Sequence, residues 1–407
     1  MIIVSQELIQ EKASKVREIQ ASFFEWDNGD VFNMLKEVDS PNGVPGTIKV
    51  VKDGKKVQVN EFGSPYDKVR ILSIVQSNKV NELSSPSKNL KISGFVRKNS
   101  KWEKRKIQVI PVGEQIFSRC EGVLETSVLS DKYVVIIGLG SVGSWIALFF
   151  AKSGVCNSLL IDPDRLETVN NVRHVGGLSN VGRYKTKVMR DMVLDRNPSA
   201  IVETIQDGFF AKNIESFREA FSKADLVIDA TGDQQSGLLA NRLCYETKTT
   251  FIKAGVYSKA RGGQIHVVEP GFSACLQCYR MAKDESIDRD QEKNESEQVS
   301  ETSYEYGREI PEPGLELEIM PINVMASNLA IQKLLKNKET TRHSLDEDLI
   351  APLYIWLNRR DPGSPWKSLK PLGFNMHGPR ILQWIGVNVL KNPDCPVCGE
   401  FYGDDPF

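Results

Sequence analysis

Apolar and polar positions alternate in blocks between about residue 119 and residue 270. Short apolar runs predict strands at 133–137, 158–161, 201–205, 225–229, 250–254 and 264–268. The intervening segments have helical spacing and predict helices that end near 152 or span about 183–195, 211–222 and 236–246. Strands that alternate with helices in this way are typical of an α/β fold, with a doubly wound, mostly parallel sheet covered by helices on both faces.

The first 118 residues follow a different pattern. Helical spacing predicts a helix over roughly 5–38, and the next stretch, GTIKVVKDGKKVQVNEFG, alternates around Asp53-Gly54 and predicts a hairpin. Two further strand-like stretches, LKISGFV and RKIQVIPV, complete what we predict to be a small α+β domain over 1–118. Residues 119–407 then form the second domain. We find no catalytic motif in the first one.

One segment interrupts the second domain. Residues 281–313 are acidic, rich in serine and nearly free of aliphatic side chains, so we expect a mobile loop or lid. The stretch GLELEIMPINVMASNLAIQKLLK then predicts a helix, and the C-terminal tail predicts strand and loop.

Composition narrows the classes of protein. The chain has 407 residues, of which 40% are hydrophobic and 26% charged, as in ordinary globular proteins. A net charge of −1 gives no nucleic-acid footprint, and no apolar run has the length of a membrane span. The N-terminus carries a short apolar run without a basic region or cleavage site, so we expect a cytoplasmic protein.

The stretch VVIIGLGSVGS carries the first candidate chemistry. Gly138, Gly140 and Gly143 have GxGxxG spacing between a predicted strand and a predicted helix. In such a unit the glycines allow a tight turn, close approach of a phosphate and close helix packing, while the helix N-terminus offers free N–H groups to an anion. Asp162, at the end of the next predicted strand, is placed to bind ribose hydroxyls. The turn therefore predicts a nucleotide site.

Charged and polar residues follow Asp162, namely Asp164, Asn170, Arg173 and Lys185. Two fixed cations beside a phosphate-binding turn suit a triphosphate better than the diphosphate bridge of a nicotinamide cofactor. We therefore favour ATP, and an NAD-dependent dehydrogenase is a distant alternative. A single arginine or lysine is usually a solvated surface charge, so the prediction depends on the set.

The chain has 7 cysteines, and four of them form two CxxC pairs, Cys275/Cys278 and Cys395/Cys398. Four thiolates at this spacing close a tetrahedral zinc site with no open position for water. We predict a structural Zn²⁺ that staples the C-terminus to the nucleotide-binding domain. The alternatives are two unrelated thiol pairs or a redox pair.

Six motifs in this order resemble the ThiF/MoeB/HesA superfamily: GLGSVGS, LLIDPDRLETVNNVRH, VGRYKTK, VIDATGD, SACLQC and CPVCG. This superfamily contains the adenylating domains of ubiquitin-activating enzymes and their bacterial relatives, and the resemblance covers about 119–400. It implies a Rossmann-like site for Mg-ATP. The C-terminal glycine carboxylate of a ubiquitin-like protein would attack the α-phosphate, giving an acyl-adenylate and pyrophosphate.

The resemblance also implies partners and an assembly. We expect a homodimer, and an N-terminal domain that recruits the protein substrate or a conjugating enzyme. The organisation is similar to that of enzymes encoded in some bacterial ubiquitin-like conjugation operons.

The resemblance assigns roles to single residues. Its phosphate-binding turn corresponds to Gly138, Gly140 and Gly143, and its ribose-binding acid corresponds to Asp162. Its triphosphate ligands correspond to Asn170 and Arg173, and its catalytic lysine corresponds to Lys185. Asp233 matches the Mg²⁺-binding aspartate best, but an inserted glycine leaves Asp229 as its rival. Arg119 is the candidate for an arginine that reaches the partner subunit's ATP. For His174 we favour a packing or capping role.

A thioester cysteine is not evident. The segment 281–313, where many ubiquitin-activating enzymes carry one, contains no cysteine. We predict Cys156 and Cys244 to be core residues, and Cys120, beside Arg119, is a weak candidate. We therefore favour adenylation followed by transfer to an external thiol or sulfur donor over a thioester on this chain. Two further alternatives are a peptide-modifying adenylyltransferase of the microcin-maturation type and a catalytically dead scaffolding subunit.

Overall fold

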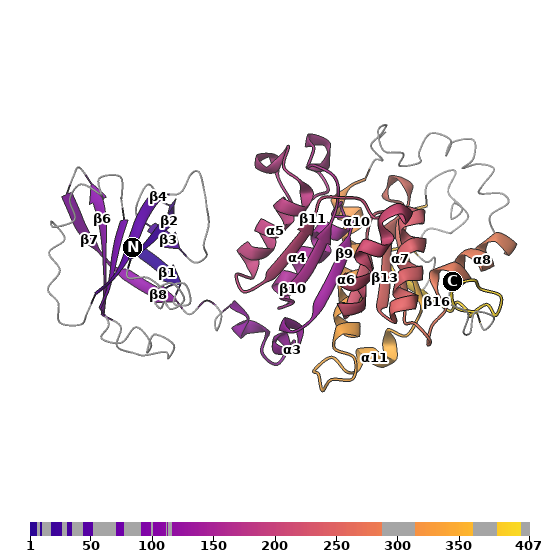
Figure 1. Ribbon diagram of the computed structural model, residues 1–407. Helices are drawn as coiled ribbons and strands as arrows, with labels where there is room; N and C mark the ends of the chain where they lie inside the picture. Colours follow the sequence, from indigo (N-terminus) through magenta and orange to yellow (C-terminus); the bar gives the residue numbers. More distant parts are fainter. Residues whose placement is uncertain are drawn as a thin grey trace, which may run out of the picture. The chain divides into compact units, whose positions relative to one another are not determined.

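The computed structural model describes residues 1–5, 9, 18–26, 31–34, 44–51, 71–76, 91–98, 101–110, 112, 116–286, 314–360 and 381–399. The chain divides into two compact units, 1–119 and 120–407 (Figure 1). Each unit has its own sheet, and the nucleotide turn belongs to the second.

The described part of unit 1–119 is a mixed sheet. Its strands are β1 (Ile2–Ser5), β2 (Glu18–Trp26), β3 (Val31–Met34), β4 (Val44–Val51), β5 (Ile71–Gln76), β6 (Lys91–Lys98), β7 (Lys101–Arg105) and β8 (Ile107–Ile110). They lie in the order β7-β6-β5-β4-β2-β3-β1-β8. A separate core that includes Ile2, Phe23, Phe32 and Ile48, each at most 1% exposed, holds the unit together.

The helix predicted over 5–38 is wrong, because β2 and β3 lie within that range. β2 pairs antiparallel with β4 along one edge and with β3 along the other. Its sequence, EIQASFFEW, includes isoleucine and three aromatic residues, which favour strands once a partner edge is present. The first arm of the predicted Asp53-Gly54 hairpin is β4, which pairs with β2 and β5. The predicted second arm lies outside the described residues.

Unit 120–407 contains the predicted doubly wound sheet. Its strands are β9 (Tyr133–Ile137), β10 (Asn157–Ile161), β11 (Ile201–Ile205), β12 (Leu226–Asp229), β13 (Thr250–Val256), β14 (Gly262–Val268), β15 (Leu353–Leu357) and β16 (Trp384–Val387). The order is β11-β10-β9-β12-β13-β14-β15-β16; the first five strands are parallel and the last three join antiparallel. The chain order reverses between β9 and β12, which is where such sheets bind ligands.

Helices cover both faces of this sheet (Figure 1). They are α3 (Thr126–Ser130), α4 (Gly143–Lys152), α5 (Lys185–Arg196), α6 (Arg218–Lys223), α7 (Gln234–Thr247), α8 (Leu276–Ser286), α10 (Glu316–Leu334) and α11 (Leu345–Asp348). α4, α5 and α10 pack on one face, and α6 and α7 on the other. β9 divides accordingly: Val134 and Ile136 enter one core, and Val135 and Ile137 enter the other. A strand buried on both faces explains its unbroken apolar sequence.

Two details of the second unit differ from the prediction. The helix expected at about 211–222 is a 3₁₀ segment, 211–217, followed by α6. Residues 281–286 of the predicted loop instead belong to α8, which continues to Ser286. The rest of that predicted loop, 287–313, lies outside the described residues. Among the helices that the structure describes, none combines the length and apolar character that crossing a bilayer requires.

Candidate nucleotide site and cysteine cluster

The glycine turn is built by close backbone approach. Gly138 has φ +83°, and a Cβ there would lie 2.7 Å from the Thr231 nitrogen. A Cβ on Gly143 would lie 1.9 Å from the Gly138 oxygen, so neither position tolerates a side chain. A Cβ on Gly140 would meet nothing within 4 Å. The turn is therefore closely packed at Gly138 and Gly143 and open at Gly140, which is the geometry that a phosphate needs to approach the backbone.

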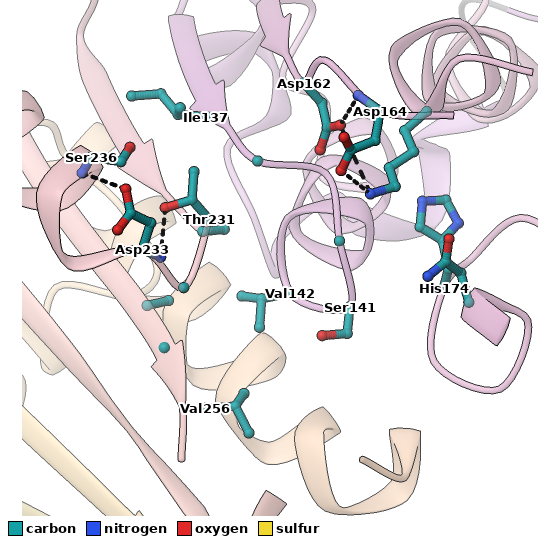
Figure 2. A pocket seen from close by; sticks show the side chains of 18 of the residues that line it. Ile137, Ser141, Val142, Asp162, Asp164, His174, Thr231, Asp233, Ser236 and Val256 are labelled. Atoms are coloured by element: carbon teal, nitrogen blue, oxygen red, sulfur yellow. Dashed lines mark hydrogen bonds and ion pairs between the residues drawn. The ribbon is translucent and has the colours of Figure 1, made fainter. Parts of the chain in front are cut away.

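This open side faces a pocket of about 710 Å³ at the carboxyl ends of β9, β10 and β12. The volume lies within the range of ordinary small-molecule sites. Of the residues predicted from the sequence, the pocket is lined by Gly138, Gly140, Asp162, Asp164, Asn170, Arg173, His174, Lys185 and Asp233. Figure 2 shows Asp162, Asp164 and His174 across the pocket from Thr231, Asp233 and Ser236.

Asp162 and Asp164 hold Lys185 at one side of the pocket. The Lys185 Nζ lies 2.8 Å from Asp164 Oδ2 and 3.9 Å from Asp162 Oδ1. Asp162 is 5% exposed, and its carboxylate accepts hydrogen bonds from the backbone nitrogens of Leu139, at 2.7 Å, and Asp164, at 2.8 Å. Burial raises the pKa of Asp162, and the Lys185 ammonium opposes that shift. Asp162 thus joins the end of β10 directly to the glycine turn.

Asn170, Arg173 and His174 form the adjoining wall. The Asn170 side chain accepts a hydrogen bond from the Glu167 nitrogen at 2.9 Å and closes the short 3₁₀ turn that precedes Arg173. His174 is buried, and its Nδ1 accepts from the Gly176 nitrogen at 2.8 Å. Burial and the nearby Lys185 charge lower the pKa of His174 to about 4, so the ring is neutral at pH 7. His174 both lines the pocket and caps its own loop.

The two rival aspartates have different surroundings. Asp229 is fully buried, its Oδ1 accepts from the Thr231 hydroxyl at 2.7 Å, and its Oδ2 forms an ion pair with Lys253. Asp233 lines the pocket and caps α7 by accepting from the backbone nitrogens of Gln235 and Ser236. Capping leaves lone pairs on both Asp233 oxygens. Only Asp233 of the two is placed to meet a pocket ligand.

The four paired cysteines come together in space. The Sγ atoms of Cys275, Cys278, Cys395 and Cys398 all lie within 4.8 Å of one another. Three of the Sγ–Sγ distances are 3.6 Å for Cys275–Cys395, 3.9 Å for Cys275–Cys278 and 3.2 Å for Cys278–Cys398. Four sulfurs around one Zn²⁺ at Zn–S of about 2.3 Å would be about 3.8 Å apart. The cluster therefore fits a closed four-sulfur metal site.

A model of the ThiF family matches residues 112–349, more than half of the chain. The chain belongs to the ThiF family. The superfamily resemblance of its motifs is thereby confirmed, as is the doubly wound fold.

Curated relatives of this ThiF-family chain include ubiquitin-like modifier-activating enzyme 5 from several organisms. The Caenorhabditis briggsae protein is 29% identical over 158 residues, covering 37% of each chain. The Arabidopsis thaliana protein is 30% identical over 158 residues, covering 36% of this chain and 37% of that protein. The chain thus spans less than two-fifths of the length of these relatives. The crystal structure of E. coli MccB matches with a TM-score of 0.50 at 18% identity, covering 69% of each chain, which shows a shared fold.

One residue that the ThiF-family resemblance assigned to the site lies outside the pocket, and several residues that line the pocket were not predicted from the sequence. Arg119 is exposed in a short 3₁₀ segment, 118–120, and is not among the described residues that line the pocket. The wall made by residues 207–210 was not predicted, although its position directly after β11 was a usable signal. Arg165 was also missed; its guanidinium donates to the Gly182 oxygen at 2.8 Å and stacks on Tyr184 at 3.9 Å.

The remaining cysteines differ in environment. Cys244 is fully buried, as predicted, and burial raises the pKa of its thiol well above the ordinary value. Cys156 is partly buried, with its Sγ 3.4 Å from the Asn197 amide nitrogen. Cys120 is also partly buried. Neither Cys156 nor Cys120 lines the described pocket of this ThiF-family chain.

Glu316, the first residue of α10, titrates near neutrality. Desolvation raises its pKa from 4.5 to about 7, while the hydrogen bond from Asn323 and the nearby Trp145 side chain oppose the shift. The folded protein therefore holds this proton more tightly than the unfolded chain does, and the free energy of unfolding falls as pH rises from about 4.5 to 7. Glu316→Gln should remove this pH-dependent fall in the free energy of unfolding.

We expect Glu316→Gln to raise the free energy of unfolding by about 1 kcal/mol at pH 8. This is less than the pKa shift alone would give, because Glu316 is only partly buried and solvent screens its charge. At pH 5 the gain should vanish, because the wild-type carboxyl is then largely protonated in the folded protein. Urea denaturation at both pH values measures the difference. An equal change at pH 5 and pH 8 would show that Glu316 does not titrate in this range.

Proposed function

We propose that the chain catalyses ATP-dependent adenylation of the C-terminal carboxylate of a ubiquitin-like protein, giving an acyl-adenylate and pyrophosphate. The observation that supports this most is the convergence of the glycine turn, Arg173, Lys185 and Asp233 on one pocket. The names of the curated relatives support the same substrate class.

The site suits this reaction because both reactants are anionic. A carboxylate that approaches a triphosphate is repelled until the phosphate charge is neutralised. In the proposal Arg173 and Lys185 supply two positive charges, and the turn around Gly140 supplies backbone N–H groups. Asp162 binds the ribose hydroxyls. Asp233 would hold Mg²⁺, which adds positive charge at the phosphates when bound. None of these roles requires proton transfer.

The cysteine cluster is proposed to hold a structural Zn²⁺. All four ligands are sulfur, and a closed S₄ set is typical of structural zinc. Cys275 lies immediately before α8 and Cys395 in the C-terminal loop, so the ion would join segments 120 residues apart in sequence.

The assembly completes the proposal. We propose a homodimer in which Arg119 reaches the partner's ATP, and an N-terminal unit that recruits the protein substrate or a conjugating enzyme. The activated carboxyl passes to an external thiol or sulfur donor, since Cys244 is buried and Cys120 and Cys156 lie off the pocket.

ATP–pyrophosphate exchange tests the function. A small protein that ends in glycine and is encoded beside this chain is the substrate to supply, and we expect exchange that depends on it. Intact-mass measurement separates the second candidate, a peptide-modifying enzyme of the MccB type, which would leave a stable AMP adduct on a peptide. Absence of exchange with every such protein and peptide would favour a scaffolding subunit with an inactive site.

The two aspartates give a sharper test of the site. Asp233→Asn should lower the exchange rate on the order of 100-fold and leave the melting temperature near that of wild type, since asparagine still caps a helix. Asp229→Asn should instead destabilise the fold by about 3 kcal/mol, because Lys253, whose side chain is 13% exposed, loses its buried partner. Exchange kinetics over a Mg²⁺ titration, with thermal denaturation of both variants, measures this. The reverse pattern would move the proposed Mg²⁺ ligand to Asp229.

A further inference from the structure

Asn323 lies in the middle of α10, and its side chain contacts the glycine turn. Its side chain is fully buried. The amide nitrogen Nδ2 donates one hydrogen bond to the Ser141 carbonyl oxygen, at 3.0 Å, and one to Glu316 Oε1, at 3.1 Å. Ser141 belongs to the glycine turn and lines the pocket (Figure 2). A turn residue and a helix residue 182 positions apart are thus joined by one side chain.

The orientation of this amide is determined by its partners. The Ser141 carbonyl can only accept, so it takes one N–H of Asn323, and Glu316 Oε1 accepts the other. The reversed orientation would place the Asn323 oxygen against the Ser141 carbonyl oxygen. The Ser141 carbonyl therefore fixes the amide with an N–H pointing at the turn. A buried amide with both protons in use is a rigid anchor.

A second side chain holds the turn on the other side of Gly140. Asp162 accepts from the Leu139 nitrogen at 2.7 Å. Leu139 and Ser141 flank Gly140, the one turn glycine at which an added Cβ would meet open space. Two buried side chains, one directly after β10 and one in α10, thus hold the backbone on either side of the residue that faces the ligand.

We infer that Asn323 is a positioning residue for the phosphate-binding turn: it holds the Ser141 peptide so that the backbone around Gly140 is preorganised for the nucleotide. The nucleotide part of this inference rests on the proposed function, whereas the role of Asn323 in holding the turn does not. Weakening a preorganised contact lowers affinity, because the turn must then be ordered at the moment of binding. Loss of one buried hydrogen bond corresponds to about a tenfold change in an equilibrium.

Asn323→Asp is the decisive variant, because it keeps the size of the side chain and replaces the donor with an acceptor. The chain offers a matched control on the same helix. Gln332 is 3% exposed and donates through Nε2 to Asp346 Oδ1 and, at 3.4 Å, to the Arg342 oxygen, so it also joins a carboxylate to a carbonyl. Gln332→Glu imposes the same chemical change away from the turn. Asn323→Ala and Gln332→Ala form a second pair without the added charge.

The first readout is backbone hydrogen exchange in the absence of nucleotide. The Ser144 and Ile146 amides donate to the Gly140 and Val142 oxygens at 3.1 Å, and their protection reports on the turn. We expect about tenfold faster exchange of these amides in both Asn323 variants than in the matched Gln332 variants. Equal exchange in the two series would overturn the inference, whatever the protein binds.

The second readout is the Mg-ATP dissociation constant from isothermal titration calorimetry. We expect it to rise about tenfold in Asn323→Ala relative to Gln332→Ala. Faster exchange with an unchanged dissociation constant would overturn the positioning role. If the Asn323 variants exchange faster but the wild-type protein binds no Mg-ATP, the proposed function is contradicted. The role of Asn323 in holding the turn would still be supported.

Discussion

Lys185→Ala should lower the rate of substrate-dependent ATP–pyrophosphate exchange on the order of 100- to 1,000-fold. Lys185 is the first residue of α5, and its Nζ lies between Asp164 Oδ2, at 2.8 Å, and Asp162 Oδ1, at 3.9 Å. The charge that the variant removes is therefore held in place at the pocket wall rather than on a mobile surface chain. A preorganised charge is worth more in the transition state than one that must first be ordered.

The size of the effect follows from the reaction chemistry. In the proposed reaction a carboxylate attacks a phosphorus that carries negative oxygens, and the barrier includes their mutual repulsion. The pocket lining carries more carboxylates than cations, so it repels anions except where Arg173 and Lys185 offset that charge. Removal of one cation changes both the attraction for the triphosphate and the alignment of the attacking group. We expect a rise in the KM for ATP together with a fall in kcat.

Lys187→Ala is the control for this variant. Lys187 lies two residues along the same helix, is exposed, and its Nζ donates to the Thr204 hydroxyl at 2.9 Å. It should retain exchange activity within about twofold of wild type, as is usual for surface substitutions. Thermal denaturation of both variants checks that the fold is intact. Wild-type exchange in a folded Lys185→Ala protein would refute the charge-neutralisation mechanism.

The sequence predicted the parts of the second unit whose signals are local. A strand buried on both faces is a continuous apolar run, and the run 133–137 is β9. The glycine spacing follows from contacts within the turn itself, since Gly143 must accommodate the Gly138 oxygen. Each CxxC pair is likewise a local signal, and four thiols in two such pairs predicted a shared metal site. These signals appear directly in the sequence, although only the fold brings the two pairs together across 120 residues.

Constraints that act over long distances were not predicted. Residues 18–26 form a strand because β3 and β4 supply edges for pairing, and no local pattern announces those partners. The sequence favoured Asp233 but left Asp229 as its rival; the two differ in the structure because Lys253, on the neighbouring strand, pairs with Asp229. Asn323 reads as an ordinary polar position in an apolar helix. Its contact with Ser141 is visible only once the helix is placed on the sheet.

The cysteine cluster should carry a large share of the stability of the second unit. Cys275, Cys278 and Cys395 are each 1% exposed and belong to the core that also contains Leu243. A bound Zn²⁺ would close a segment of 120 residues between Cys275 and Cys395, and closure of a long loop removes much entropy from the unfolded chain. Four sulfurs within 4.8 Å of one another would otherwise repel one another as thiolates.

Cys395→Ser should therefore lower the free energy of unfolding by about 3 kcal/mol or more, with a fall in melting temperature of about 10 °C. Metal analysis by mass spectrometry should find one zinc per wild-type chain and little in the variant, and a strong chelator should reproduce the loss of stability in the wild type. Cys156→Ser is the control, since Cys156 is a partly buried thiol outside the cluster. Because a metal bound at the cluster would join the C-terminal loop to α8, and none of the four cysteines lines the pocket, zinc loss should lower the active fraction of the protein rather than its affinity for ATP. A zinc-free wild type, two hydrogens lighter for each joined cysteine pair, would instead identify the cluster as a redox pair.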